Sequence, residues 1–283
     1  MIYLNGQLMP LADARVSVMD RGFLFGDGVY EVIPVYSRRP FRLPEHLRRL
    51  RASLDGIRLA NPHSEEEWAT LVGRIVELGE TEDQSVYIQV SRGPMAVRNH
   101  AFPARVEPTV LLMGELLHTP PEEQRRSGIC AISAADIRWL RCDINTTSLL
   151  ANCLLRQAAI EAGCTETLLF RDGCLTEGAA SSIFVLREGR LLVPPKTHLM
   201  LPGITYDVVL ELARDHGLPH EVRDVPEDEV RRADELWMTS STKEVLPIVR
   251  LDGHPVGQGR PGPVFAAMYG WYQDYKRTVM RGG

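Results

Sequence analysis

Hydrophobic residues recur at helical spacing in two neighbouring segments of the first third of the chain. The positions are Leu47, Leu50, Leu54 and Ile57 in the first segment, and Trp68, Leu71, Val72 and Ile75 in the second. Spacings of three and four residues place apolar side chains on one face of a helix, so the pattern predicts helices over residues 45–59 and after Ser64. Ser64 is a favoured N-cap residue, and the three glutamates that follow it suit the positive end of the helix dipole.

Shorter apolar runs predict strands along the rest of the chain. They cover residues 29–36, 85–92, 108–113, 129–134, 166–170, 182–186, 191–193 and 235–238. Asn5 and Gly6 predict a hairpin over residues 2–10, because this dipeptide favours a two-residue turn. Residues 20–31 are rich in glycine and are expected to form a bent loop, since their spacing matches neither a dinucleotide-binding nor a Walker loop.

Three further helices are predicted, over residues 147–162, from residue 202 to residue 217, and over residues 263–278. The first has several apolar residues available for burial, namely Leu149, Leu150, Cys153, Leu154, Ala158 and Ile160. Residues 118–126 combine two prolines with a run of charged and polar residues, which is typical of a linker. We therefore expect an α+β domain over residues 1–117 and an α/β domain over residues 127–283.

Composition narrows the class of protein without identifying it. The chain has 283 residues and a net charge of −5, which does not favour nucleic acid as a general partner. It contains no apolar run of membrane-spanning length, and its first residues read as a strand and a turn rather than a signal peptide. The five cysteines are odd in number and form no CxxC pair, so we expect free thiols in a cytoplasmic protein and no metal site.

Two stretches carry candidate chemistry. In the first, Glu177 is followed by Gly178, two alanines and then Ser181 and Ser182, before an apolar run. Small residues allow close approach of a ligand, hydroxyl and N–H groups can bind phosphate, and a carboxylate can keep a ring nitrogen protonated. A strand-edge turn with a solvated glutamate is the simpler interpretation of this stretch alone. The second stretch covers residues 137–150 and includes Asp143, Ile144 and Asn145.

Together these stretches resemble the D-amino-acid aminotransferase family, the fold type IV enzymes that use pyridoxal 5′-phosphate (PLP). The resemblance extends over nearly the whole chain and implies two domains with the cofactor site between them. In that family the second stretch ends Asp-Ile-Lys, and the lysine binds PLP covalently. Asn145 occupies this position here. Asparagine cannot form an imine with an aldehyde or shuttle a proton as an amine does.

The resemblance also implies the residues that hold the cofactor. Glu177 would lie at the ring nitrogen, and the phosphate-side residues would be Arg49, Ser181, Ile204, Thr205, Ser240 and Ser241. A helix that begins after Gly203 would offer free N–H groups to the phosphate. Taken singly, Arg49 is better interpreted as a solvated helix arginine. Ser182 and Tyr206 depart from the family, which usually has asparagine and arginine there.

Tyr30, Arg98 and His100 match a family trio that binds the substrate α-carboxylate. Arginine offers a planar pair of donors and tyrosine adds a hydroxyl. In the family the arginine and histidine come from the partner subunit, which implies a homodimer. A loop histidine bonded to backbone is the simpler interpretation of His100 alone. Trp139 lies in a stretch that matches D-amino-acid transaminases. The simpler interpretation of this residue is an ordinary core aromatic.

The remaining lysines are Lys196, Lys243 and Lys276. Lys276 is expected to be solvated, and Lys243 is expected to point away from the aldehyde.

The leading hypothesis is therefore a D-amino-acid transaminase with strongly impaired turnover, which holds PLP non-covalently or as trapped external aldimine or pyridoxamine phosphate. Two alternatives remain: a non-catalytic PLP-binding protein, and an enzyme similar to aminodeoxychorismate lyase, against which the Arg98–His100 pair argues.

Overall fold

The computed structural model describes residues 1–105 and 107–282, and it divides into two compact units. Unit 1 contains Met1–Leu117 and Ile144–Leu149, and unit 2 contains His118–Asp143 and Leu150–Gly283. Residue 283, the end of the expected second domain, lies outside the described residues. The expected linker, residues 118–126, contains the start of a short helix at Glu122. The segment that holds Asn145 belongs to unit 1 although it lies well beyond that linker in sequence.

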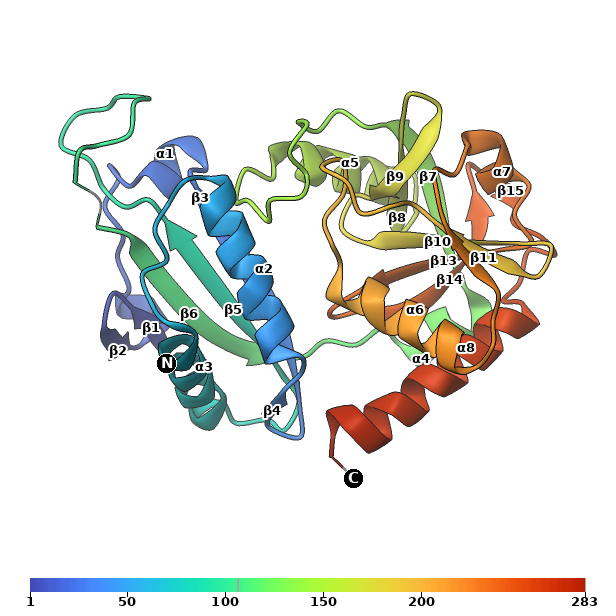
Figure 1. Cartoon of the computed structure of the whole chain (residues 1–283), viewed down its shortest axis with the longest axis horizontal. Helices are drawn as coiled ribbons and strands as arrows, with labels where there is room; N and C mark the ends of the chain where they lie inside the picture. The colour runs from blue at the N-terminus through green and yellow to red at the C-terminus, as the bar shows by residue number, and fades with distance from the viewer. Residues whose placement is uncertain (106, 283) are drawn as a thin grey trace. The chain divides into compact units, whose positions relative to one another are not determined.

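Unit 1 is an antiparallel sheet with helices packed on it. Its elements are β1 (Ile2–Leu4), β2 (Gln7–Met9), a 3₁₀ turn (Leu11–Asp13), α1 (Arg21–Phe25), β3 (Gly28–Tyr36), β4 (Arg39–Pro40), α2 (Leu43–Gly56), α3 (Glu65–Leu78), β5 (Gln84–Ser91) and β6 (Thr109–Leu116). Among the described residues the strand order is β2-β1-β6-β5-β3-β4, and every pairing is antiparallel. In Figure 1, α2 and α3 lie over the same face of this sheet.

The two predicted helices of unit 1 are confirmed as α2 and α3, and each buries the face that its spacing indicates. Ser64 caps α3 as expected: its hydroxyl accepts a hydrogen bond from the Glu67 amide at 3.2 Å, and the Glu67 carboxylate accepts one from the Ser64 amide at 2.7 Å. This reciprocal pair satisfies two donors at the helix start. The expectation of a loop over residues 20–31 is partly wrong, because Asp20 caps the short helix α1 there.

Unit 2 has a mixed sheet flanked by helices. Its elements are α4 (Glu122–Ser127), β7 (Ile129–Ala135), α5 (Leu150–Glu161), β8 (Glu166–Arg171), β9 (Cys174–Gly178), β10 (Ser182–Arg187), β11 (Arg190–Val193), α6 (Ile204–Asp215), β12 (His220–Val222), α7 (Glu227–Arg231), β13 (Glu235–Ser240), β14 (Glu244–Leu251), β15 (His254–Pro255), α8 (Pro263–Tyr275) and a terminal π turn (Lys276–Met280). The strand order is β12-β11-β10-β13-β14-β7-β8-β9, with β15 on β14. Pairs β11–β12, β14–β7 and β7–β8 are parallel. The mixed helix-and-sheet class expected from the sequence is confirmed.

The predicted burial along α5 is wrong. Leu150, Leu154 and Ile160 are more than half exposed, and the helix instead buries Leu155 and Ala159 against the sheet of unit 2. The helix also begins three residues later than predicted, because residues 144–149 belong to unit 1. There Thr147 donates its amide to the carbonyl of Gly28 at 3.0 Å, which competes with a helical conformation.

Among the described residues, no helix combines the length and apolar character needed to cross a membrane.

Candidate active site

Glu177 is a buried residue of β9, one position before Gly178 ends the strand. The interpretation as a solvated glutamate in a turn is therefore wrong. The turn comes directly afterwards, and it folds tightly back on itself. A Cβ atom at Gly178 would lie 2.2 Å from Ser181 Oγ, so a larger residue could not be accommodated without moving Ser181. The chain thus uses Gly178 to bring Ser181 and the end of β9 close together.

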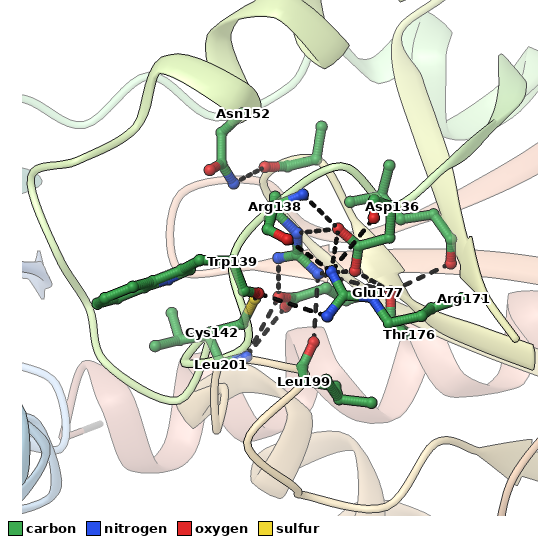
Figure 2. Close-up of polar contacts among 12 residues, drawn as sticks. Asp136, Arg138, Trp139, Cys142, Asn152, Arg171, Thr176, Glu177, Leu199 and Leu201 are labelled. Carbon is green, nitrogen blue, oxygen red and sulfur yellow. Dashed lines mark hydrogen bonds and ion pairs between the residues drawn. The ribbon is translucent and has the colours of Figure 1, made fainter.

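Arg138 is the main partner of Glu177 and was not assigned a role from the sequence. Its Nη1 donates to Glu177 Oε1, while its Nε and Nη2 donate to the two carboxylate oxygens of Asp136 at 2.9 and 2.8 Å. Figure 2 shows this guanidinium between the two carboxylates. The backbone amide of Leu201 adds hydrogen bonds to both oxygens of Glu177, at 3.2 and 3.3 Å.

Asp136 is held by further groups of unit 2. The hydroxyl of Thr176 donates to Asp136 Oδ2 at 3.1 Å, and Arg171 Nη2 lies 3.2 Å from Asp136 Oδ1. Arg171 also donates to the carbonyl of Arg138 at 2.8 Å. The network therefore fixes both the position and the backbone of Arg138, and through it the carboxylate of Glu177 (Figure 2).

The pKa values of Asp136 and Glu177 depend on burial and on how each carboxylate interacts with Arg138. Burial raises the pKa of Glu177 to about 7, against the opposing effect of Arg138. For Asp136, burial also acts to raise the pKa, but the hydrogen bonds and charge of Arg138 outweigh it and the pKa is lowered. Asp136 is thus the permanent anion of the pair. Glu177 is balanced near neutrality, so an additional positive charge beside it would favour its ionised form.

Five of the six residues predicted for the phosphate belong to unit 2, the unit that also contains Glu177. Ser182 of β10 pairs with Thr239 of β13, so the start of β10 and the end of β13 are adjacent. Gly203, the N-cap of α6, approaches the same place, since a Cβ there would lie 2.8 Å from Ser182 Oγ. The structure therefore brings together five predicted phosphate-side residues at one end of these strands, namely Ser181, Ile204, Thr205, Ser240 and Ser241.

The start of α6 fits the phosphate of a phosphorylated cofactor. Gly203 gives the first turn of α6 no side-chain cap, so the amides at the helix start are available to an anion. Thr239 Oγ1 is buried and has no hydrogen-bond partner among the described residues. Thr239 and Ser240 are consecutive residues of β13, so their side chains lie on opposite faces of the sheet, and this hydroxyl is not evidence for the phosphate site.

The two departures from the family near this end are accommodated by packing. Tyr206 is buried, donates its hydroxyl to the carbonyl of Pro194 at 3.0 Å and packs on Phe184 with ring centroids 5.4 Å apart. Ser182 is buried beside Gly203 and leaves no room there for a side chain on that glycine. Neither residue disrupts the start of α6.

In unit 1, Asn145 is buried and its side chain is already engaged. Its Nδ2 donates to the carbonyl of Tyr30 at 2.6 Å, and the Tyr30 amide donates to the carbonyl of Asn145 at 2.9 Å. The Asn145 amide in turn donates to Ser53 Oγ at 3.1 Å. The lysine position of the family and the predicted carboxylate-binding tyrosine are therefore directly linked through main chain and side chain.

The other two residues of the predicted carboxylate trio lie on an exposed loop between β5 and β6. The ring of His100 lies 5.1 Å from that of Phe25, and the Arg98 guanidinium lies 5.0 Å from the centroid of the same ring. Tyr30 itself stacks on Tyr87 with centroids 5.8 Å apart. The substrate-binding roles of Tyr30, Arg98 and His100 remain predictions.

Arg49 is not the solvated helix residue that its position on α2 also allowed. Its side chain is only 9% exposed, and it donates from Nε and Nη2 to the two oxygens of Glu31 at 2.7 and 2.8 Å. His46 Nδ1 lies 2.8 Å from Glu31 Oε2 and completes the cluster. The structure thus shows what orients Arg49, while its contact with phosphate remains a prediction.

The expectation that Lys276 is solvated is wrong, because it pairs with the buried Glu244 at 2.5 Å. Lys196 pairs with Asp207 at 2.5 Å. Lys243 is partly buried, and burial lowers the pKa of its ammonium group.

Trp139 is 46% exposed, so its interpretation as a core aromatic is also wrong. In Figure 2 it extends away from the network around Glu177.

The fold defines a class of protein, the fold type IV enzymes, which depend on PLP. The amino-transferase class IV family matches residues 28–251, and the chain belongs to that family. It is thus a member of a PLP-dependent aminotransferase family, as the sequence resemblance indicated.

Two curated relatives align with almost the whole chain. It is 40% identical over 263 residues to a D-alanine aminotransferase of Bacillus licheniformis, covering 93% of this chain and 92% of the relative. It is 35% identical over 275 residues to a D-alanine aminotransferase of Staphylococcus aureus (strain MW2), covering 97% of each.

Solved structures show the same fold. The branched-chain amino acid aminotransferase of Escherichia coli gives a TM-score of 0.90 at 26% identity, covering 99% of this chain and 94% of that one. A second branched-chain amino acid aminotransferase, from T.th. and solved with pyridoxamine 5′-phosphate, gives a TM-score of 0.91 at the same identity and coverage.

Sequence reasoning missed Arg138 and Asp136, which control Glu177. The signal was present, because Arg138 lies in the stretch whose resemblance to D-amino-acid transaminases was noted. What the sequence could not show is that β9 places Glu177 beside that stretch, which requires the pairing of β8 with β9.

Proposed function

We propose that this chain is a D-amino-acid transaminase in which Asn145 replaces the lysine, so that it binds PLP without a covalent bond and turns over slowly. The observation that carries the proposal is the burial and hydrogen bonding of the Asn145 side chain. It is buried at the family's lysine position, and its only side-chain nitrogen donates to the carbonyl of Tyr30 at 2.6 Å. A carboxamide nitrogen is neither a nucleophile nor a base at neutral pH, so this position offers no amine.

The cofactor assignment rests on this chain's own groups. When bound, PLP supplies an aldehyde and an electron-withdrawing ring. Glu177 would hold the proton on the ring nitrogen, and Arg138 and Leu201 would keep the carboxylate in place through their hydrogen bonds. The amides at the start of α6, with Ser181, Ser240, Ser241 and Arg49, would bind the phosphate.

The substrate assignment is supported by the relatives and by three side chains. Both reported relatives are D-alanine aminotransferases, whereas the reported structures are branched-chain aminotransferases. Arg98 and His100, two residues apart, favour D-amino acids over branched-chain L-amino acids. With Tyr30 they would bind the substrate α-carboxylate and leave the reacting carbon exposed to the cofactor. The 2-oxo acid partner would use the same groups.

The proposal includes a homodimer, because the sequence resemblance implies that the arginine and histidine come from a partner subunit. Light scattering during size-exclusion chromatography should give twice the 31.7 kDa mass of the chain. A monomer at micromolar concentration that also fails to bind a D-amino acid would contradict this part of the proposal.

The decisive variant is Asn145→Lys, assayed with D-alanine and 2-oxoglutarate. Positioned proton transfer contributes about 10²- to 10⁴-fold to such reactions, and we expect a gain of that order. Asn145→Gln is the matched control, because it lengthens the side chain without adding an amine, and it should show no gain. If Asn145→Lys binds PLP but gains no activity with D-alanine, the proposal is wrong.

A non-catalytic PLP-binding protein is the second candidate, and the same absence of an amine at position 145 favours it. The two candidates differ in the half-reaction. Residual transamination predicts slow conversion of bound PLP to pyridoxamine phosphate when D-alanine is added to the unaltered chain. A pure binding protein would show no conversion however long the incubation, although its affinity for PLP would be retained.

A further inference from the structure

The loop that carries Arg98 and His100 has little packing of its own. Residues 96–102 are all exposed, and residues 92–105 form no strand beyond an isolated bridge between Asp20 and Pro94. In Figure 1 the loop extends beside α1, away from the sheet of unit 1. An exposed loop cannot fix a carboxylate-binding arginine unless another element holds it.

Arg21 of α1 holds this loop through its main chain. Its Nη1 donates to the carbonyls of Asn99 at 2.6 Å and Ala101 at 3.2 Å, and its Nη2 donates to the carbonyl of His100 at 3.1 Å. The Arg21 amide also donates to the carbonyl of Gly93, where the loop begins. One guanidinium thus binds three consecutive carbonyls around His100, and the first of them belongs to the residue after Arg98.

The Arg21 side chain is itself held in place by an ion pair with Asp27. It is almost fully buried, and its Nε donates to Asp27 Oδ2 at 2.7 Å. The same oxygen accepts a hydrogen bond from Arg92 Nε at 2.8 Å. Asp20 caps α1 by accepting from the Gly22 amide at 2.7 Å, so the helix that carries Arg21 has a fixed start.

The side chains of the loop also meet α1. The ring of Phe25 lies 5.1 Å from that of His100 and 5.0 Å from the guanidinium carbon of Arg98, and Arg21 lies 5.0 Å from the same ring. Arg21 and Phe25 are four positions apart, which places both on one face of the helix. That face therefore contacts the loop twice, through its carbonyls and through its two functional side chains.

We propose that Arg21 is the positioning residue of the carboxylate-binding loop, and that it fixes Arg98 and His100 without touching the substrate. This inference rests on the roles that the proposed function gives to those two residues. Binding three consecutive carbonyls requires arginine, because a planar guanidinium offers five donors in a rigid arrangement. A lysine at position 21 would keep a positive charge near Asp27 but could not bind three carbonyls in fixed directions.

Arg92 provides a matched control for Arg21. Both arginines are almost fully buried and both donate to Asp27 Oδ2. Arg92 directs its remaining bonds to the carbonyls of Ile57 and Arg58, at 2.6 and 3.3 Å. It also lies over Phe102 at 3.7 Å, a contact that a lysine ammonium can retain. Arg21→Lys and Arg92→Lys thus disturb the same ion cluster, but only the first disturbs residues 99–101.

The first readout is the order of the loop, measured by cleavage after Arg98 with an arginine-specific protease. In Arg21→Lys we expect cleavage about 10- to 100-fold faster than in the unaltered chain, because the main chain beside Arg98 loses three hydrogen bonds. Arg92→Lys should change the rate less than twofold. Equal rates in all three proteins would overturn the proposal, and equal acceleration in both variants would show general destabilisation and overturn it too.

The second readout is recognition of the carboxylate, measured in the Asn145→Lys background. Arg21→Lys should raise the KM for D-alanine about 10- to 100-fold, because a small misplacement of binding groups has effects of this size. Its kcat/KM for an amine that lacks the α-carboxylate should stay within twofold. Loss of activity towards both substrates to the same extent would contradict a positioning role.

Phe25→Leu keeps the inference testable if Arg21→Lys does not fold. It removes the ring beside Arg98 and His100 without removing a buried charge, and it should shift both readouts in the same direction by a smaller factor. An unchanged Phe25→Leu protein beside an unfolded Arg21→Lys protein would overturn the proposal. If Asn145→Lys is inactive, the proposed function fails, and cleavage after Arg98 still decides whether Arg21 orders the loop.

Discussion

Glu31 in unit 1 and Glu177 in unit 2 are both buried carboxylates beside an arginine, yet their pKa values move in opposite directions. Burial acts to raise the pKa of Glu31, but the neighbouring Arg49 and His46 outweigh it and lower the pKa to about 2. Burial raises the pKa of Glu177 to about 7, and Arg138 does not overcome it. The same pair of residue types therefore gives a permanent anion in one unit and a proton acceptor near neutrality in the other.

The difference lies in how each arginine shares its donors. Arg49 donates two hydrogen bonds to Glu31, one to each oxygen. Arg138 gives its paired donors to Asp136 and only Nη1 to Glu177. Asp136 also repels the ionised form of Glu177. An arginine beside a buried carboxylate thus does not by itself fix its charge: burial has the largest effect on the pKa of Glu177, and Asp136 adds to it. This arrangement suits Glu177 to hold the proton of a ring nitrogen.

The largest expected effect concerns the ion pair of unit 1. Glu31→Gln removes the charge that Arg49 and His46 contact inside the protein, and breaking such a buried pair typically costs about 3–5 kcal/mol. The free energy of unfolding, measured by urea denaturation at pH 7, should fall by this amount. A loss below about 1 kcal/mol would show that the Glu31 cluster does not stabilise unit 1.

Glu177→Gln, unlike Glu31→Gln, should reduce activity strongly and stability only slightly. In the Asn145→Lys background, kcat should fall about 10²- to 10³-fold, or about 2.7–4 kcal/mol, because one preorganised charge at the reacting group is lost. Its stability should fall by only about 0.5–1.5 kcal/mol, since Arg138 keeps its bonds to Asp136. If kcat of the Glu177→Gln enzyme stays within threefold of its parent, Glu177 is not the ring acid.

The two carboxylates should also give opposite dependences of stability on pH. The pKa of Glu177 is about 7 in the folded chain against an ordinary value of 4.5, so the folded state binds more protons between these values. Its contribution of about 3 kcal/mol is present below pH 4.5 and is lost as the pH rises through about 7. Glu31 contributes above pH 4.5, and that contribution is lost as the pH falls through about 2.

Urea denaturation at intervals from pH 4.5 to pH 7.5 separates these contributions. Relative to the unaltered chain, Glu177→Gln should remove a decline of stability over this range. Glu31→Gln should lower stability by a constant amount over the same range. The account of the two pKa values fails if the two variants have the same pH profile.

The smallest expected effect tests why the two sites differ. Asp136→Asn removes the repelling charge and frees Arg138 to favour Glu177, so the pKa of Glu177 should fall from about 7 towards its ordinary range. Infrared difference spectroscopy of the carboxyl stretch, with Glu177→Gln to assign the band, measures this directly. An unchanged pKa in Asp136→Asn would mean that burial alone sets it.

The sequence predicts elements best where the signals are local. The helix after Ser64 follows from its apolar spacing and its cap, and both are found. The fold class and the family follow from motifs whose order is preserved along the chain. The short helix α1 was missed, because residues 20–31 contain glycines and the cap at Asp20 also serves distant residues, Ser91 and Thr109, as a hydrogen-bond acceptor.

Long-range arrangements were beyond the sequence. The burial along α5 was mispredicted, because apolar spacing does not reveal which of two faces meets the sheet. Arg138 and Arg21 were not assigned, since an arginine's role depends on which carbonyls and carboxylates surround it after folding. Lys276 was expected in solvent, yet it meets Glu244, which lies far from it in sequence. The candidate positions were predictable, whereas the groups that orient them were not.

The central claim is that the chain keeps its contacts for the cofactor but lacks the amine at position 145. Borohydride reduction of the PLP-loaded protein, followed by intact mass measurement, tests it directly. We expect PLP absorbance before reduction and an unmodified mass after it, with a single PLP adduct at position 145 only when the Asn145→Lys variant is treated identically. A PLP adduct on any lysine of the unaltered chain at one equivalent of cofactor would contradict the account.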